Sequence, residues 1–145
     1  MRALIQRVVM ARVTVAGEVV GEIGPGLLLF LVFHKGDREA EALALLDKVL
    51  AYRVFADARG RMNHSLREVG GGLLVVSQFT LAADTGKGLR PGFDPAETPA
   101  RARELYGYFL QEAQARHGKV AAGVFGADMQ VALVNDGPVT FLLAP

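Results

Sequence analysis

Short apolar runs separated by glycine-containing turns recur along the chain and predict a β-sheet. The run Leu73–Val76 is partly β-branched and follows three glycines, and its length favours a buried strand over a helix. Residues 4–15 are rich in Val and Ile and predict a strand that bends near Met10. Residues 27–33 form a continuous apolar run, which is typical of a strand covered on both faces.

Shorter runs toward the end of the chain complete the predicted sheet. We expect strands at residues 119–125, 129–134 and 139–143, with a turn at Asn135–Pro138 between the last two. A further short strand follows the Ala16-Gly17 turn. Residues 63–68 carry no clear period and are expected to be irregular.

Two segments have helical rather than strand periodicity. Residues 37–53 predict an amphipathic helix with Asp37 as its N-cap. Thr98 followed by Pro99 predicts a second helix start, and Gly118 its end. Together the patterns predict an α/β fold in one domain over residues 1–145, with a curved mixed sheet or barrel of about seven strands and two helices packed on it.

Composition narrows the class of protein. The chain has 145 residues, about half of them hydrophobic, so it can bury a substantial core. It contains no cysteine, which excludes a disulfide framework and a thiolate nucleophile. The first residues lack the apolar segment of a signal peptide, and the run 27–33 is too short to span a bilayer, so no membrane span is expected. The net charge of +1 predicts that any RNA contact is local.

The end of the central strand is unusually polar. Ser77, Gln78 and Thr80 follow the apolar run, with Phe79 between them. Continued strand alternation would place Gln78 and Thr80 on one face. Such a cluster is either a hydrogen-bonded core feature or the floor of a site, and the residues alone leave both readings open.

Other candidate chemistry is sparse. The histidines, His34, His64 and His117, lack neighbours at metal-ligand spacing and are interpreted as surface residues, so no metal and no cofactor are expected. Thr80 has no base near it in sequence. The segment Asn135–Thr140, NDGPVT, is consistent with an ordinary turn, although its adjacent carbonyls could accept hydrogen bonds from an ammonium group.

SQFTL at Ser77–Leu81 together with NDGPVT at Asn135–Thr140 resembles the D-aminoacyl-tRNA deacylases, the D-tyrosyl-tRNA(Tyr) deacylase family. The resemblance extends over the whole chain through IQRV, RVFAD, GRMN, GLRPGF and GADMQV. Either signature alone is weak, but the pair at this spacing is specific.

The resemblance implies a cytoplasmic, homodimeric hydrolase that proofreads charged tRNA. It would cleave the ester between a D-amino acid and the 3′-terminal adenosine, and glycine mischarged on tRNA(Ala) could also pass. The Gly137-Pro138 bond is implied to be cis, to enter the partner subunit's site and to exclude L side chains, with Arg7 bracing it. The adenosine is expected near Phe125 and Met129.

The resemblance leaves the catalytic step with two routes. The backbone N–H groups of Phe79 and Thr80 are candidates for an oxyanion hole. Thr80 could attack the ester directly, but we favour water oriented by the ribose 2′-hydroxyl. Five basic residues could contact phosphates, although each alone is better explained as surface charge: Lys87, Arg90, Arg101, Arg103 and Lys119. The alternatives are a non-catalytic module that binds tRNA 3′ ends and a general esterase using Ser77 or Thr80.

Overall fold

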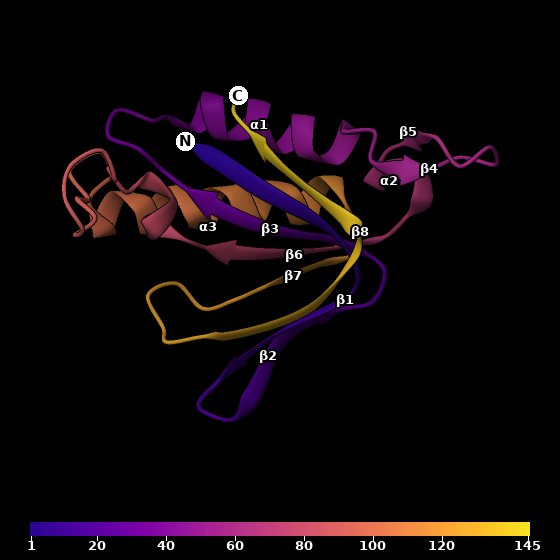
Figure 1. Cartoon of the computed structure of the whole chain (residues 1–145), viewed down its shortest axis with the longest axis horizontal. Helices are drawn as coiled ribbons and strands as arrows, with labels where there is room; N and C mark the ends of the chain where they lie inside the picture. The colour runs from indigo at the N-terminus through magenta and orange to yellow at the C-terminus, as the bar shows by residue number, and fades with distance from the viewer.

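A curved mixed sheet forms the centre of the molecule, and helices cover one of its faces (Figure 1). The computed structural model describes all residues from 1 to 145. The strands are β1 Arg2–Val15, β2 Glu18–Ile23, β3 Gly26–Val32, β4 Phe55–Ala56, β5 Met62–His64, β6 Gly72–Ser77, β7 Val120–Ala122 and β8 Gln130–Leu143. The helices are α1 Glu39–Ala51, α2 Leu66–Val69 and α3 Pro99–Arg116, with a 3₁₀ helix η1 at Phe79–Ala82.

Strand β1 organises the main sheet because it is paired along both edges. The order is β2-β1-β3-β6-β7, and β8 pairs with the other edge of β1. The β3–β6 and β6–β7 pairs are parallel, whereas β1 is antiparallel to all three of its neighbours. The first half of β1 pairs with β3 and the second half with β2, which curls the sheet. The predicted curved mixed sheet with two long helices packed on it is confirmed.

The sheet curls until β2 approaches β7, so that the barrel is nearly closed. At this contact a Cβ added to Gly21 would lie 2.5 Å from the carbonyl oxygen of Ala122 and 3.2 Å from Cδ1 of Leu74. Real Cβ atoms do not come this close to a backbone oxygen. Glycine at position 21 therefore permits the close approach of the two strands.

Two apolar cores lie on opposite faces of β3 and β6. Leu29 and Val75 point toward α1 and α3, whereas Leu28 and Leu74 point into the barrel. All four side chains are fully buried. The period-two alternation explains why these strands are continuous apolar runs in the sequence, because each face packs on its own core.

The helices differ in detail from the sequence prediction. Helix α1 begins at Glu39 with Arg38 as the N-cap, not Asp37. Asp37 instead accepts a hydrogen bond from the backbone N–H of His34 and pairs with the amino terminus. Helix α3 begins after Thr98 with Pro99 in its first turn, as predicted, and ends at Arg116.

Two predictions about the remaining segments are wrong. Residues 63–68 are not irregular, because β5 and α2 lie there and Ser65 and Glu68 form a capping box. The segment Asn135–Pro138 does not separate two strands, because β8 runs continuously along β1 through it. In β8 the register moves from Thr140 opposite Gln6 to Asn135 opposite Val8, so the intervening residues form a bulge.

No helix of this fold has the length and apolar character that a membrane crossing requires.

Candidate functional site

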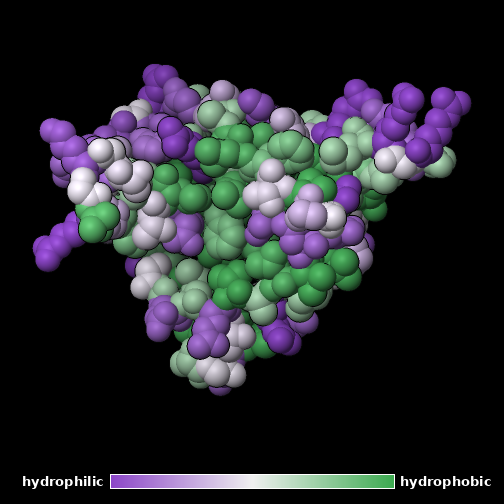
Figure 2. Space-filling view, in the orientation of Figure 1, coloured by the Kyte–Doolittle hydropathy of each residue, from purple (hydrophilic) through white to green (hydrophobic).

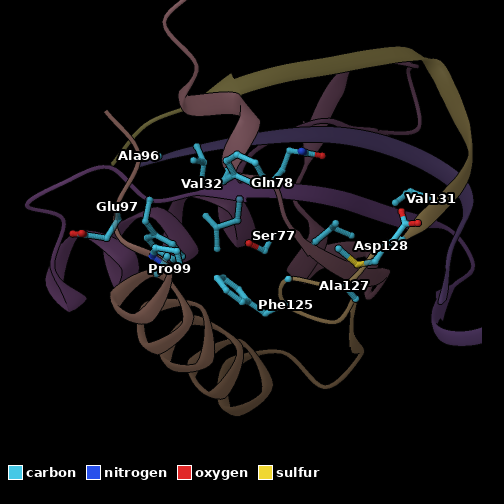
Figure 3. Close-up of a pocket in the computed structure, with 17 residues that line it drawn as sticks. Val32, Ser77, Gln78, Ala96, Glu97, Pro99, Phe125, Ala127, Asp128 and Val131 are labelled. Carbon is cyan, nitrogen blue, oxygen red and sulfur yellow. The ribbon is translucent and has the colours of Figure 1, made fainter. Parts of the chain in front are cut away.

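The polar end of β6 opens into a mainly apolar cavity (Figure 3). The cavity has a volume of about 520 Å³, which lies in the range of small-molecule sites, roughly 300–1,000 Å³. It is bounded by the end of β6, the start of α3 and the segment between β7 and β8. Its lining residues include Ser77, Gln78, Phe79, Glu97, Phe125 and Met129.

The SQFTL segment does not continue as a strand. Strand β6 ends at Ser77, and the chain turns at Gln78 into η1. The alternation argument that placed Gln78 and Thr80 on one strand face is therefore wrong. The two side chains are nevertheless together, because the Gln78 amide donates to the Thr80 hydroxyl across the turn.

The backbone at the start of η1 has two unused donors. The N–H of Gln78 donates to the Leu31 carbonyl at 2.8 Å, and that of Leu81 to the Gln78 carbonyl at 3.2 Å. The N–H groups of Phe79 and Thr80 between them donate to no atom of the chain, because the first residues of a helix have no acceptor within it. Two adjacent free N–H groups beside a cavity are a chemically suitable place for an oxyanion.

Phe125 forms the opposite side of the cavity and is held by aromatic and cationic contacts. Its ring centroid lies 5.7 Å from that of Tyr106, and the Arg103 guanidinium lies 4.8 Å from it. The Tyr106 hydroxyl donates to the Val75 carbonyl at 3.0 Å. Burial raises the pKa of Tyr106 to about 12, so this phenol remains neutral and supports the wall rather than transferring protons.

Several lining residues were missed by sequence reasoning. Glu97 and Asp128 are the ionisable side chains of the lining, and Figure 3 shows them on different sides of the cavity. Phe93 packs on Phe79 with a centroid separation of 5.0 Å. Phe93 belongs to the GLRPGF segment and Asp128 to the GADMQV segment, so both segments were known to resemble the family. Nothing in the local sequence indicated that the two segments lie near the same cavity.

The NDGPVT bulge of β8 is fixed by side chains from distant parts of the chain. Arg7 donates from Nε to the Asp136 carbonyl at 3.0 Å and from Nη1 to the Val54 carbonyl at 2.7 Å. Within the bulge, the Asn135 side chain accepts from the Val139 N–H at 2.8 Å and donates to the Thr140 hydroxyl at 3.0 Å.

The Gly137-Pro138 peptide in the bulge is cis, as the resemblance implies, and both residues are exposed.

Within one chain the bulge and the cavity are far apart. Arg7 of β1 contacts the bulge and pairs with Leu27 of β3, and Leu27 in turn pairs with Leu73 of β6. Ser77 lies four residues further along β6. Strand rise and strand spacing then separate Gly137 from Ser77 by on the order of 20 Å. Neither Arg7, Gly137 nor Pro138 lines the cavity. The two signature motifs therefore do not form one site within a single chain.

The surface around the bulge is apolar. Val134 and Leu142 of β8 and Val9 of β1 are each at least 50% exposed. Figure 2 shows hydrophobic side chains gathered across the middle of this face, over the region of β1 and β8. Strand β8 also pairs only with β1, so its other edge is open.

The candidate phosphate-binding residues are in different environments. Arg101 is paired with Glu39 and Glu104. Lys119 lines a second cavity of about 580 Å³, next to the glycines that precede β6 and at the opposite end of that strand from Ser77. Lys87 and Arg90 lie on an exposed loop. Arg103 alone among the five contacts a residue of the first cavity.

The histidines do not all lie on the surface. His117 is only 9% exposed, and its Nε2 lies 2.6 Å from the Gly71 carbonyl oxygen, so its prediction as a surface residue is wrong. His34 is partly buried and His64 is exposed. No three His, Asp or Glu side chains cluster in a way that could hold a metal ion.

Comparisons with known proteins give consistent full-length matches. Residues 4–144 match the family described as D-Tyr-tRNA(Tyr) deacylase. The chain is 62% identical over 143 residues to a D-aminoacyl-tRNA deacylase of Cellvibrio japonicus, with 99% of this chain and 98% of that protein covered. It is 61% identical over 143 residues to one of Pseudomonas putida, with 99% of each covered.

Solved structures match equally completely. One named c-Myc DNA Unwinding Element Binding Protein has a TM-score of 0.95 and 37% identity, with 100% of this chain and 99% of that chain covered. A probable eukaryotic D-amino acid tRNA deacylase has a TM-score of 0.86 over 98% of this chain and 97% of its own, and at 17% identity this likeness concerns the fold alone.

Proposed function

Because this chain belongs to the D-Tyr-tRNA(Tyr) deacylase family, we propose that its cavity holds the aminoacylated 3′ end of a tRNA. The protein is a hydrolase, a D-aminoacyl-tRNA deacylase. The observation that supports this use of the cavity is the pair of unpartnered N–H groups at Phe79 and Thr80 beside a nucleoside-sized space.

The terminal adenosine is proposed to bind between the Phe125 ring and Met129. Both side chains line the cavity and are partly buried, and an apolar, aromatic wall suits a purine base. This position leaves the ribose and its ester to face Ser77, Gln78 and the start of η1. The N–H groups of Phe79 and Thr80 then stabilise the oxyanion that forms as the ester is attacked, and losing one such donor typically costs about 100-fold or more in rate.

Water is the proposed nucleophile, oriented by the 2′-hydroxyl of the terminal ribose. The Thr80 hydroxyl accepts a hydrogen bond from Gln78 and has no histidine, lysine or carboxylate bonded to it, so no group of this chain is in place to remove its proton. Thr80 shapes the turn that presents the two N–H groups.

The rejection of L-amino acids is proposed to come from the partner subunit of a homodimer. The carbonyls of Gly137 and Pro138 would accept hydrogen bonds from the substrate ammonium, and their backbone would occupy the space of an L side chain. The separation of the bulge from the cavity within one chain, the exposed apolar side chains around it and the open edge of β8 support this arrangement.

Glycine has no side chain to exclude, so glycine mischarged on tRNA(Ala) is a proposed second substrate. A cytoplasmic role in translation quality control follows from these substrates.

Activity is tested by incubating the protein with D-Tyr-tRNA and L-Tyr-tRNA and measuring the amino acid released. We expect rapid release of D-Tyr and negligible release of L-Tyr. A binding module would release neither, and a general esterase would also cleave small activated esters and react with covalent serine inhibitors. Either result would overturn the proposed function.

The shared site is tested by complementation between two inactive variants. Phe125→Ala damages the cavity and Arg7→Met damages the bulge, and we expect each homodimer to be inactive. After mixing, half of the dimers are mixed and each holds one intact cavity facing one intact bulge, so roughly a quarter of wild-type activity should return. No recovery in subunit-exchanged mixtures would show that cavity and bulge do not work across subunits.

A further inference from the structure

Arg103 lies on α3 at the rim of the cavity, where its guanidinium is oriented by contacts with Phe125 and Gly126. Its guanidinium carbon is 4.8 Å from the centroid of the Phe125 ring. Its Nη2 atom is 3.8 Å from the position that a Cβ on Gly126 would occupy. The preceding residue, Ala102, and both Phe125 and Gly126 line the cavity.

The donors of Arg103 are free, unlike those of the other arginines on α3. Arg101 pairs with Glu39 at 2.9 Å, and Arg116 pairs with Asp47 at 3.0 Å. Arg103 has no carboxylate within ion-pair distance and makes no hydrogen bond in the chain. Stacking on an aromatic ring holds a guanidinium in place while its N–H groups remain available to a ligand.

The charge of the cavity defines which part of a nucleotide can enter it. No lysine, arginine or histidine lines the cavity, and Figure 3 shows the carboxylates of Glu97 and Asp128 directed away from its centre. A phosphate inside would lose its water with no cation to replace it, whereas a neutral nucleoside carries no charge to desolvate. The phosphate attached to a nucleoside in this cavity must therefore lie outside, at the rim.

We propose that Arg103 binds the phosphate on the 5′ side of the terminal adenosine, and so couples the cavity to the RNA chain. The proposal rests on the proposed function, because it assumes that the adenosine stacks against Phe125. The planar guanidinium offers two parallel N–H groups to the phosphate oxygens, a geometry that a lysine cannot reproduce. Arg103 is thus a substrate-binding residue that distinguishes a polynucleotide end from a free aminoacyl nucleoside.

The test compares two small substrates that differ only in this phosphate. One is 3′-O-D-tyrosyl-adenosine and the other is its 5′-monophosphate, and D-Tyr-tRNA is assayed alongside. For Arg103→Gln we expect kcat/KM to fall by about fivefold or more with the two phosphate-containing substrates, as for a partly screened charge-assisted hydrogen bond. With the nucleoside substrate kcat/KM should stay within about twofold of wild type, since only the ring contact changes there.

Salt dependence gives a second readout that a purely structural role would not change. The slope of log kcat/KM against log salt concentration for D-Tyr-tRNA should become shallower by about 0.7 in Arg103→Gln, the value for one phosphate contact on a single strand. Arg103→Lys should keep most of that slope. The matched control is Arg59→Gln, which removes the same charge from an exposed turn and should change neither quantity.

The outcomes are distinguishable. An equal loss on both small substrates would mean that Arg103 acts only by supporting Phe125, and no loss on either would mean that it does not contact substrate; each result overturns the proposal. If the wild-type protein hydrolyses none of the three substrates, the proposed function itself fails.

Discussion

Arg7 connects the bulge of β8 to the segment after α1, and replacing it tests that connection directly. We consider Arg7→Met, which keeps the unbranched apolar stem and removes the guanidinium. The Val54 carbonyl loses a donor at 2.7 Å and the Asp136 carbonyl a donor at 3.0 Å. Val54 is 1% exposed, so water cannot easily replace the first of these bonds, whereas Asp136 is exposed and can be hydrated.

The magnitude follows from this difference in exposure. A hydrogen bond to a charged group contributes about 1.5–3 kcal/mol, and a buried acceptor left without a donor costs about 1–3 kcal/mol. The Asp136 contact and its 3.6 Å ion pair are partly screened and add little. We therefore expect the free energy of unfolding to fall by about 2–3 kcal/mol, with an unchanged dependence on urea concentration.

Urea unfolding at fixed protein concentration measures this loss, and deacylation of D-Tyr-tRNA by the folded variant measures its effect on function. We expect activity to fall more than about tenfold under conditions where the variant is folded, because displacement of the bulge by even 1 Å disturbs the substrate position. Arg59→Met is the control for loss of an arginine. An unfolding free energy within about 0.5 kcal/mol of wild type would refute the bracing role of Arg7.

Three further predictions address the site, the barrel and the pH dependence. Thr80→Ala should keep at least about a tenth of the wild-type activity, whereas the wild-type enzyme should lose most of its activity on a substrate that ends in 2′-deoxyadenosine. An inactive Thr80→Ala variant, together with an acyl-enzyme trapped on the wild type, would instead favour attack by Thr80. Gly21→Ala should lower the free energy of unfolding by about 1–3 kcal/mol, because the new Cβ would meet the Ala122 carbonyl oxygen. Gly24→Ala is the control and should change the free energy of unfolding little, because open space surrounds position 24. Equal thermal stability of the two variants would contradict this reasoning. Burial, followed by the positive amino terminus, lowers the pKa of His34 below its ordinary 6.5, so the unfolded chain binds the proton first and stability is lost as the pH falls from 6.5 toward the folded-state pKa. The free energy of unfolding should therefore depend less on pH in His34→Gln than in the wild type. An unchanged dependence between pH 7.5 and pH 5.5, roughly a unit on either side of the ordinary pKa, would refute this role of His34.

The sequence predicts the parts of this fold whose cause is local. The run Leu73–Val76 is a buried strand because each face meets an apolar core, and Thr98-Pro99 precedes a helix because proline suits a first turn. The bulge at Asn135–Pro138 was mistaken for a turn between strands because Asp-Gly is common in hairpins. Arg7 holds the bulge of β8 against β1, and it lies 129 residues away in sequence from the Asp136 carbonyl to which it donates.

The candidate site was predictable in its motifs but not in its surroundings. Of the residues that the resemblance implies for the site, Ser77, Gln78, Phe79, Phe125 and Met129 line one cavity, whereas Thr80 does not. Glu97, Asp128 and Arg103 come from separate segments whose sequences carry no common pattern. His117 was assigned to the surface because nothing near it in sequence indicates that it packs against the Gly71 carbonyl.

The absence of basic side chains from the cavity lining has a consequence for the end of the catalytic cycle. An aminoacyl ester contributes no negative charge where it is cleaved, but the amino acid released from it carries a carboxylate. That new anion forms in a space whose lining contains no basic side chain to retain it. We therefore expect the spent amino acid to leave readily, so that the enzyme is poorly inhibited by its own product even where free D-amino acids are abundant.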